Sequence, residues 1–415
     1  MDSTLTERNP ASHSLLLAER FLPHAGGSRV YYYHLMRNWE PDRVTVFTKK
    51  TPGWEEFDRE ESTEHFHILR KFAPMPSLKY KDLPKAILPM LQACVLASRR
   101  AVDVVHCGDL FPCGVSALFL KRSLGIPFVT YCHGEDITLT ERSRFQPGLR
   151  THIYMSADVV IANSDSSRRL LRKIGVPDER IRKITPGVDF DVFRPAPRSA
   201  RLIARYGLYG FSVLLTVARL VPRKGHDMVM QSVARLRRDF PRLKYLIVGK
   251  GPEEPRLRQL AAELNIEQNV VFAGLVPQQE LADHYRLADV MVMPNRAENG
   301  DMEGFGMTFL EASATGKPVV GGRSGGAAEA VSDGITGTLV DPNDVEDLTA
   351  AIHELLSQPR RAATMGKAGL DRARSEFNWE TRAQELQLIT RNVAAGRRKR
   401  KGYVSSQAGI AGRSV

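Results

Sequence analysis

The strongest constraint on the fold is an alternation between short apolar segments rich in β-branched residues and longer segments with helical periodicity. The apolar segments are bounded by Gly, Pro, Asp or Asn, which is typical of strands buried on both faces of a parallel sheet. We expect strands at residues 15–17, 44–47, 102–106, 128–131, 159–162 and 181–184, and again at 213–217, 245–248, 270–272, 290–293 and 318–320. This alternation predicts an α/β fold with two doubly wound parallel sheets.

The domain organisation follows from length and from one linker. A chain of 415 residues exceeds what a single core usually holds. The segment RPAPRSA at residues 194–200 is rich in Pro and lacks apolar periodicity, so it is the expected linker. We therefore predict an N-terminal domain at 12–193, a C-terminal domain at 201–376 and a further helix from Phe377. Ligands of such sheets bind beyond the carboxyl ends of the strands, in a cleft between the domains.

Composition and charge narrow the class of protein. Apolar residues make up 42% and charged residues 26%, which indicates a globular chain. No apolar segment is long enough to span a bilayer and Met1–Pro10 is polar, which predicts a cytoplasmic location. The four cysteines lack C-x-x-C or zinc-ligand spacing, so we expect reduced, mostly buried thiols and no metal site. Half of the net charge of +12 lies in residues 396–415, which we expect to be a basic disordered tail; contact with anionic lipid or nucleic acid is the alternative.

Two cations follow the strand expected at 213–217. Arg219 lies at the carboxyl end of that strand, and Lys224 comes after a short loop that ends at Gly225. The planar donor fork of Arg and the point charge of Lys both suit a diphosphate. Where the diphosphate is a leaving group, cations that bind it more tightly as its charge develops lower the barrier. A solvated surface loop is the alternative interpretation of these residues.

A second motif, EGFGMTFLE, places Glu303 before a helix and Glu311 about two turns into it. Gly304 and Gly306 permit close backbone approach to a ligand, and the N–H groups of a first helical turn point at anions. The two carboxylates are suited to accept hydrogen bonds from the hydroxyls of a sugar and of a ribose. An ordinary helix with a capping glutamate is the alternative.

Two further candidates lie in the first half of the chain. His133 follows the strand expected at 128–131, where it can hydrogen-bond a sugar hydroxyl; a structural histidine is the alternative. Gly26 and Gly27 follow the first strand, where backbone amides can approach a phosphate or an acceptor. The G-x-G-x-x-G spacing of dinucleotide-binding loops is absent there.

Taken together, these motifs resemble the retaining glycosyltransferases of family 4 over residues 12–390. The matching elements are the Gly-Gly loop, HGED at 133–136, PGVD at 186–189, ARLVPRKG at 218–225, the glutamates at 303 and 311, SGGAAE at 324–329 and FNW at 377–379. The resemblance implies the GT-B fold, in which two Rossmann-like domains face each other across a cleft and a C-terminal helix, here 377–395, crosses back to the acceptor-binding N-terminal domain. The loop MPNRAENGDMEGFGM is similar to that of GDP-mannose-dependent mannosyltransferases acting on phosphatidylinositol mannosides.

The resemblance also implies an activity: transfer of a hexosyl group of mannose or glucose type from a GDP- or UDP-sugar to a lipid-linked or saccharide hydroxyl. Arg219 and Lys224 would hold the donor diphosphate, and Glu303 would contact the donor sugar. His133 would lie beside the transferred sugar. Retention would proceed without a covalent protein intermediate, and no cofactor or metal is implied because the two cations supply the positive charge.

The remaining donor contacts implied by the resemblance come from backbone and ribose-binding groups. Glu311 would bind the ribose, and Gly27 would border the donor phosphates and the acceptor site. The backbone amides of 305–307, belonging to Phe305, Gly306 and Met307, would meet the donor.

Other functions and partners stay open at this point. One alternative is another GT-B enzyme, such as an epimerase or a disaccharide-phosphate synthase, and another is a non-catalytic nucleotide-sugar or nucleic-acid binding protein, although no nucleic-acid partner is expected. Residues 69–100 interleave apolar residues with basic ones, which predicts peripheral contact with the anionic inner face of a membrane. An ordinary helix with a basic outer face is the alternative there; the basic residues are Arg70, Lys71, Lys79, Lys81, Lys85, Arg99 and Arg100.

Overall fold

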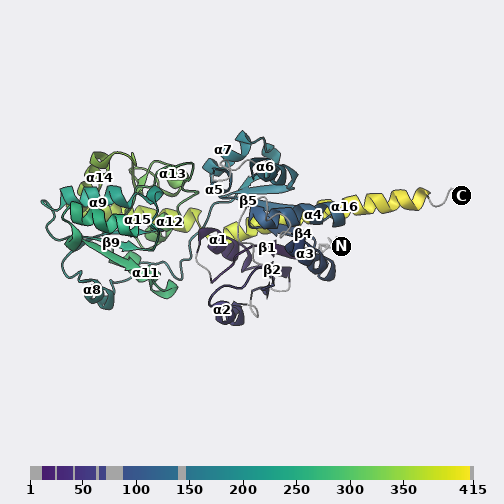
Figure 1. Cartoon of the computed structure of the whole chain (residues 1–415), viewed down its shortest axis with the longest axis horizontal. Coiled ribbons are helices and arrows are strands. Elements are labelled where there is room, and N and C mark those ends of the chain that lie inside the picture. Colours follow the sequence, from purple (N-terminus) through teal and green to yellow (C-terminus); the bar gives the residue numbers. More distant parts are fainter. Residues whose placement is uncertain are drawn as a thin grey trace, which may run out of the picture. The chain divides into compact units, whose positions relative to one another are not determined.

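A computed structural model describes residues 12–23, 26–40, 43–61, 65–71, 87–138 and 146–411, with side chains as far as residue 397. The chain forms two compact units (Figure 1). Unit 1 contains the chain up to Asn163, Arg168–Ile184 and the chain from Glu380, whereas unit 2 contains Ser164–Ser167 and Thr185–Trp379.

Unit 1 is built on a seven-stranded parallel sheet with the order β3-β2-β1-β4-β5-β6-β7. Its strands are β1 (Ser14–Leu17), β2 (Val44–Phe47), β3 (His67–Leu69), β4 (Val104–Cys107), β5 (Phe128–Cys132), β6 (Val159–Ala162) and β7 (Ile181–Lys183). The connecting helices are α1 (Gly27–Met36), α2 (Trp54–Glu61), α3 (Ile87–Arg99), α4 (Val115–Leu124), α5 (Glu135–Thr138), α6 (Gln146–Ser156) and α7 (Asp165–Lys173). The strand order changes direction between β1 and β4, which is the switch point where ligands of such sheets bind.

Unit 2 is built on a six-stranded parallel sheet with the order β10-β9-β8-β11-β12-β13, whose switch point lies between β8 and β11. Its strands are β8 (Ser212–Val217), β9 (Leu243–Val248), β10 (Val270–Gly274), β11 (Val290–Met293), β12 (Val319–Gly322) and β13 (Gly337–Val340). Its helices are α8 (Ala200–Tyr206), α9 (His226–Leu236), α10 (Glu254–Glu263), α11 (Gln278–Leu287), α12 (Met307–Ala314), α13 (Ala327–Ala330), α14 (Val345–Ser357) and α15 (Pro359–Glu376).

The apolar strands of unit 2 are buried on both faces, as the sequence predicts. Val213 and Leu215 of β8 belong to the core on one face of the sheet, and the intervening Leu214 belongs to the core on the other. Alternate residues of a strand point to opposite faces, so a strand covered on both sides has to be apolar at every position. All eleven expected strands are present, each within a few residues of its expected bounds.

Two strands that the sequence does not predict, β3 and β13, lie at sheet edges. All three residues of β3 are only half-buried, and β13 begins with Gly337 and Thr338. Edge strands need fewer apolar residues than central ones, so the short apolar run that predicts a buried strand is missing.

The expected linker at 194–200 is instead part of unit 2. Phe193 is buried in the unit 2 core, Val188 forms a bridge with Asn378, and the Ser199 side chain accepts a hydrogen bond from Leu202 N to cap α8. Because these contacts attach the Pro-rich segment to the second sheet, the two units divide at Ile184 rather than at 194–200.

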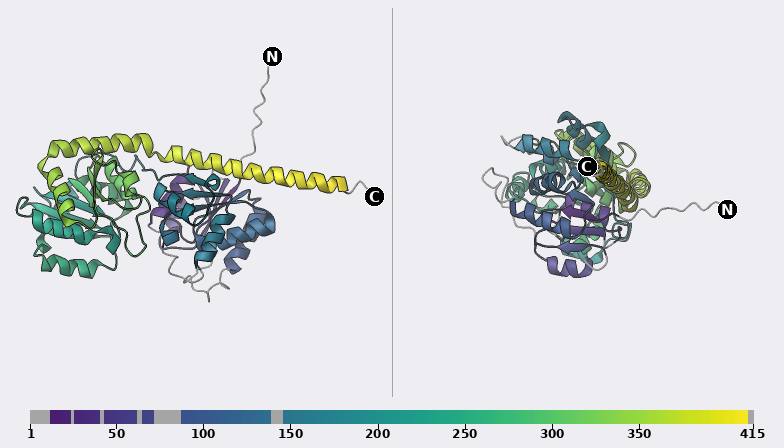
Figure 2. Two further views of the ribbon diagram at one scale, coloured as in Figure 1. Left: turned by 90° about the horizontal axis from the view of Figure 1, so that it is seen from above. Right: turned by 90° about the vertical axis from the view of Figure 1, so that its right-hand side faces the viewer.

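The C-terminal segment also differs from expectation. The helix α16 (Trp379–Ala411) begins after Phe377 and continues well beyond residue 395, so the prediction of disorder for 396–415 is wrong for 396–411 (Figure 2). No Pro interrupts this segment, which is rich in residues with good helix propensity. Within unit 1, Arg397 donates hydrogen bonds to Val102 O at 2.7 Å and to Leu124 O at 3.2 Å, and Thr390 contacts the buried His106.

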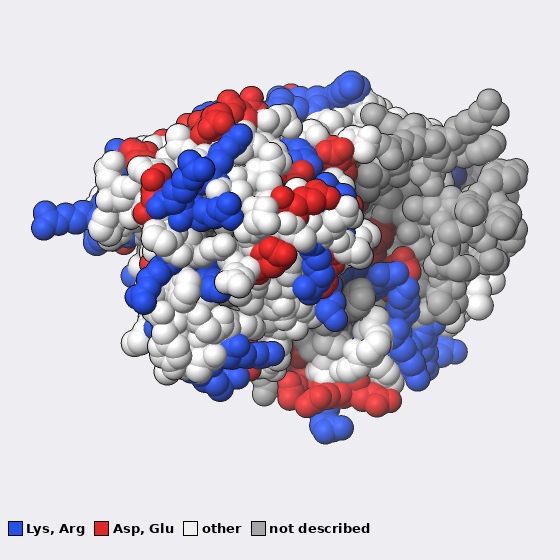
Figure 3. Space-filling view, turned by 60° about the vertical axis from the view of Figure 1, so that its left-hand side comes forward, with Lys and Arg blue, Asp and Glu red and all other residues white. Residues whose placement is uncertain are grey.

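The structure also shows the state of the cysteines and the distribution of charge on one face of the molecule. The four cysteines form no disulfide with one another; Cys94 is partly buried and the others are buried. On the face shown in Figure 3, Lys and Arg side chains are interspersed with Asp and Glu, so the positive charge there does not gather into one patch. Among the helices of the described ranges, none is both long and apolar enough to cross a bilayer.

Candidate active site

The loop that follows β8 brings the two predicted cations to the switch point of the unit 2 sheet. Arg219 is exposed, and the tight turn Pro222–Lys224 leads into α9. Gly225 has φ 71°, and a Cβ there would lie 2.4 Å from Pro294 O. Glycine therefore lets this turn approach the loop after β11 more closely than any other residue would.

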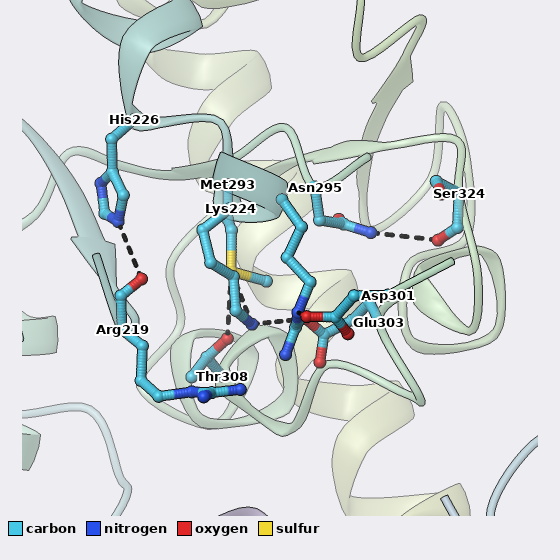
Figure 4. Close-up of polar contacts among 10 residues, drawn as sticks. Arg219, Lys224, His226, Met293, Asn295, Asp301, Glu303, Thr308 and Ser324 are labelled. Carbon is cyan, nitrogen blue, oxygen red and sulfur yellow. Dashed lines mark hydrogen bonds and ion pairs between the residues drawn. The ribbon is translucent and has the colours of Figure 1, made fainter. Parts of the chain in front are cut away.

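His226 fixes the backbone of the Arg219 loop. Its Nε2 lies 3.3 Å from Arg219 O and its Nδ1 lies 2.9 Å from Tyr245 Oη, which is consistent with a neutral ring that donates to the carbonyl and accepts from the phenol. Burial lowers the pKa of His226 to about 4, so the ring carries no charge at neutral pH. In Figure 4 the Arg219 side chain extends from this anchored backbone toward the side of the loop where Lys224 lies.

Lys224 and Glu303 form a buried ion pair, which joins two of the predicted site residues. The Lys224 ammonium donates to Glu303 Oε2, and 3.7 Å separates it from Met293 Sδ at the end of β11 (Figure 4). Burial alone would raise the pKa of the Glu303 carboxyl, but the charges of Lys224 and Arg223 outweigh it and lower the pKa to about 2. Burial also lowers the pKa of Lys224, against the opposing effect of Glu303.

Arg223 is a third cation in this cluster. Its Nη1 donates to Glu303 Oε2 at 2.7 Å, the same oxygen that Lys224 contacts, and its Nε donates to Asp301 Oδ2 at 2.9 Å. The Arg223 side chain is 8% exposed. Nothing local in the sequence indicates a role for Arg223 or Asp301, because the residues that pair with Arg223 lie 78 to 80 positions away from it.

Glycines pack the loop that carries Glu303 against the start of α12. Gly306 precedes α12 with φ 90°, and a Cβ there would lie 2.6 Å from the Phe309 ring. Gly326 N donates to Glu303 O at 2.9 Å, and a Cβ on Gly325 would lie 2.2 Å from that same oxygen. The SGGAAE motif thus supports the backbone of Glu303, a role that the sequence alone does not indicate.

Glu311 lies in α12 and takes part in a different contact from Glu303. Tyr285, from α11, donates a hydrogen bond from its hydroxyl to Glu311 Oε2 at 2.5 Å. Burial raises the pKa of Glu311 to about 7, and this hydrogen bond partly offsets the increase. Phe305 and Met307 flank Gly306 at the start of the same helix; Phe305 is buried, with its ring 5.7 Å from that of Phe377.

In unit 1, His133 follows β5 and lies among aromatic rings. Tyr32 Oη lies 2.7 Å from His133 Nε2, and Asn163 Nδ2 lies 3.4 Å from His133 Nδ1. Burial lowers the pKa of His133 to about 4, so the ring is neutral at physiological pH. Gly27 begins α1, after β1. His133 therefore follows strand β5 and Gly27 follows strand β1 of the unit 1 sheet, as predicted.

Comparisons with known proteins decide the family. Residues 25–192 match the family model described as Glycosyltransferase Family 4, and residues 207–372 match the one described as Glycosyl transferases group 1. Over 90% of this chain and 96% of the relative, it is 36% identical to a GDP-mannose-dependent alpha-(1-6)-phosphatidylinositol monomannoside mannosyltransferase of Mycolicibacterium smegmatis. The chain belongs to the family 4 glycosyltransferases.

Further similarities of this glycosyltransferase agree with that assignment. It is 31% identical to a D-inositol 3-phosphate glycosyltransferase of Thermobispora bispora over 87% of the chain and 89% of the relative. Its fold is that of the sucrose-phosphate synthase from Thermosynechococcus elongatus, with a TM-score of 0.78 and 25% identity over 93% of this chain and 100% of that one. Anabaena HepE, solved with UDP and glucose, has the same fold at a TM-score of 0.77 and 22% identity over 91% of this chain and 99% of that one. The predicted GT-B fold and glycosyltransferase family are confirmed.

The structure describes only part of the basic segment at 69–100, namely residues 69–71 and 87–100. Arg70 is buried and donates to Asp58 at 2.7 Å, so its charge is neutralised inside unit 1. Lys79, Lys81 and Lys85 lie outside the described residues. The helix α3 buries Pro89, Ala93 and Ala97, while its opposite face is apolar and half-exposed; that face consists of Ile87, Leu88, Leu91 and Val95.

Proposed function

We propose that this glycosyltransferase transfers a mannosyl group from GDP-mannose to a hydroxyl of an inositol-containing, lipid-linked acceptor, with retention of configuration and without a metal ion. The observation that carries this proposal is the cation cluster at the unit 2 switch point in a chain that is 36% identical to a GDP-mannose-dependent phosphatidylinositol mannoside mannosyltransferase. An inositol-bearing acceptor is supported by a second group of relatives, which are named for D-inositol 3-phosphate.

The donor diphosphate would bind at Arg219 and Lys224. Arg219 is exposed at the end of β8 and so is accessible to a ligand, while Lys224 supplies a second, buried positive charge. As the bond between the sugar and the diphosphate breaks, negative charge develops on the leaving phosphate. Fixed cations at that position stabilise the transition state more than the ground state. They supply the charge that a divalent metal ion provides in other transferases.

The sugar and the nucleoside would bind through the acidic residues and the start of α12. Glu303 has a second carboxylate oxygen, Oε1, with which to accept a hydrogen bond from a sugar hydroxyl. The backbone amides of Gly306 and Met307 lie at the start of α12, where a helix leaves N–H groups without intrahelical acceptors, which suits an anionic or hydroxyl-rich donor; the amide of Phe305 precedes them. Glu311 would accept hydrogen bonds from the ribose.

The acceptor side would be supplied by unit 1, with His133 beside the transferred sugar and Gly27 beside the acceptor. Both ring nitrogens of His133 already have protein partners, so a sugar hydroxyl would replace the longer contact, the 3.4 Å one between Nδ1 and Asn163, and the neutral ring would add no charge. In the proposed reaction, the acceptor oxygen bonds to the anomeric carbon on the face that the diphosphate leaves. The bond from that carbon to the phosphate oxygen breaks, and the acceptor proton passes to a phosphate oxygen. No carboxylate of the chain is required as a nucleophile.

A lipid acceptor places the enzyme at a membrane surface, and we propose peripheral contact at the cytoplasmic face. The half-exposed apolar face of α3 supports this, because isolated exposed apolar residues are common whereas a continuous helical face of them is typical of an interaction site. Arg99 and Arg100, at the end of α3, are suited to anionic headgroups.

The function is tested by incubating the purified protein with radiolabelled GDP-mannose or UDP-glucose and with phosphatidylinositol mono-mannoside, phosphatidylinositol or myo-inositol phosphate. We expect transfer from GDP-mannose to the mannoside lipid, unchanged by EDTA, with an α linkage in the product by NMR. A β linkage would contradict retention, and loss of activity in EDTA would contradict metal independence. A protein that binds neither GDP nor UDP in a thermal-shift screen would contradict the donor proposal as a whole.

A further inference from the structure

We propose that Arg223 is a positioning residue that shares the Glu303 carboxylate with Lys224, and thereby keeps the Lys224 ammonium available to the donor diphosphate. The proposal rests on the proposed function, because it assumes that Lys224 binds a diphosphate. Arg223 itself would not touch the donor, because its guanidinium is held from two sides by carboxylates of the chain, Asp301 and Glu303.

The geometry that carries the proposal is the sharing of one oxygen. Glu303 Oε2 accepts from Lys224 Nζ and from Arg223 Nη1, the latter at 2.7 Å. Each cation therefore neutralises only part of the carboxylate charge. If Arg223 were absent, Lys224 would be the sole buried partner of a carboxylate held in a region from which water is largely excluded, and that pairing would be tighter.

A tighter Lys224–Glu303 pair would oppose nucleotide binding. An incoming diphosphate competes with Glu303 for the three N–H donors of Lys224, so a stronger internal pair raises the free energy needed to redirect the ammonium. Removal of one charge-assisted hydrogen bond between Arg223 and Glu303 corresponds to about a tenfold change in affinity.

Asp301 fixes the orientation of Arg223 from the other side. The Arg223 Nε donates to Asp301 Oδ2 at 2.9 Å, so the planar guanidinium is held between two carboxylates. Asp301 Oδ1 is buried and has no hydrogen-bond partner in the described part of the chain. Asp301 therefore depends on Arg223 for neutralisation. A lysine at position 223 has a single charged group and cannot reproduce this two-sided contact.

The test is a double-mutant cycle on GDP affinity, measured by isothermal titration calorimetry on the full-length protein. The variants are Arg223→Met, Glu303→Gln and the double variant, with melting temperatures measured for each. We expect R223M to weaken GDP binding about tenfold, and E303Q alone to bind GDP at least as tightly as the parent. We expect the double variant to recover the affinity that R223M loses, because Lys224 no longer has a charged internal partner. Sugar transfer is expected to stay low in the double variant, since Glu303 is lost.

Each outcome of the double-mutant cycle either supports the proposal or overturns it. Unchanged GDP affinity in R223M would overturn it. A double variant as weak as R223M would also overturn it, because Arg223 would then act on the nucleotide or on the loop rather than through Glu303. If R223M does not fold, Arg223→Lys takes its place, and E303Q is again expected to increase the affinity of that variant for GDP. Arg219→Ala serves as the reference: if the parent binds GDP and R219A does not, the proposed function stands whatever the result at Arg223.

Discussion

Inside unit 2, the Tyr285 hydroxyl donates a 2.5 Å hydrogen bond to the partly buried carboxylate of Glu311. This contact occupies one carboxylate oxygen and leaves the other available to a ribose. Burial raises the pKa of Glu311 to about 7, so its charge changes within the physiological range. The charged form is the better acceptor for ribose hydroxyls.

The first prediction is that GDP affinity increases as pH rises from 6 to 8, with a midpoint near the Glu311 pKa. The Tyr285→Phe variant removes a hydrogen bond that favours the carboxylate, so the midpoint should move to higher pH. Titrations of GDP across this pH range, in buffers of constant ionic strength, measure both. A Y285F midpoint equal to or below that of the parent would contradict the role given to Tyr285.

The second prediction concerns stability. The pKa of Glu311 is higher in the folded protein, about 7, than its ordinary value of 4.5. The contribution of this group to stability is therefore fully present below about pH 4.5 and is lost as pH rises through about 7. Glu311→Gln keeps the shape and the acceptor for Tyr285 without the charge, so it should be more stable than the parent at pH 8 by on the order of 2 kcal/mol.

The pH dependence of that difference is its control. At pH 4 Glu311 of the parent is protonated in the folded protein and mostly protonated in the unfolded chain, so E311Q and the parent should have nearly equal free energies of unfolding in urea. A stabilisation of the same size at both pH values would show that the carboxylate charge is not the cause.

The third prediction compares the effect of losing Arg219 on sugar transfer with the effect of losing another arginine of unit 2. Arg219→Ala should lower the rate of sugar transfer by roughly 10²–10³, because it removes a cation that meets the charge developing on the leaving diphosphate. Arg238→Ala is a matched control, since Arg238 is an exposed arginine just after α9. Initial rates with labelled GDP-mannose measure both variants. Equal loss in the two variants, or none in either, would remove Arg219 from the site.

The fourth prediction uses two glycines with similar backbone angles. Gly306 has φ 90° and a Cβ would meet the Phe309 ring at 2.6 Å, whereas Gly334 has φ 74° and open space around the Cβ position. Gly334→Ala should therefore cost only the backbone strain, about 1 kcal/mol. Gly306→Ala should cost more than this and should also weaken GDP binding, because it displaces the start of α12. Urea unfolding and GDP titration together distinguish the two effects.

The fold could be predicted from the sequence wherever strands are buried on both faces, because such strands consist of apolar residues alone. The half-buried β3 and the Gly-Thr start of β13 lack that pattern. In the candidate site, the sequence indicates Arg219, Lys224 and Glu303 because each follows a strand or precedes a helix in a recognisable motif. In sequence, Arg223 is indistinguishable from a surface cation, and only the fold places Asp301 and Glu303, about 80 residues away in sequence, beside it. Tyr285 likewise fits an ordinary amphipathic helix, and only packing of α11 against α12 shows its contact with Glu311.

The fifth prediction concerns the apolar face of α3 in unit 1. Leu88, Leu91 and Val95 are each about half-exposed at helical spacing, while the other side of α3 packs on the core. Replacing Leu88 and Leu91 by Gln should reduce co-flotation with vesicles containing phosphatidylinositol, because each buried leucine contributes about 2 kcal/mol to insertion at an interface.

Leu388→Gln is the matched control, since Leu388 is a comparably exposed leucine on α16. If the α3 variant floats as the parent does, or if L388Q is equally impaired, α3 is not the membrane contact. Transfer to a water-soluble inositol phosphate acceptor should be unaffected in the α3 variant, because neither the proposed donor residues in unit 2 nor His133 and Gly27 in unit 1 belong to α3.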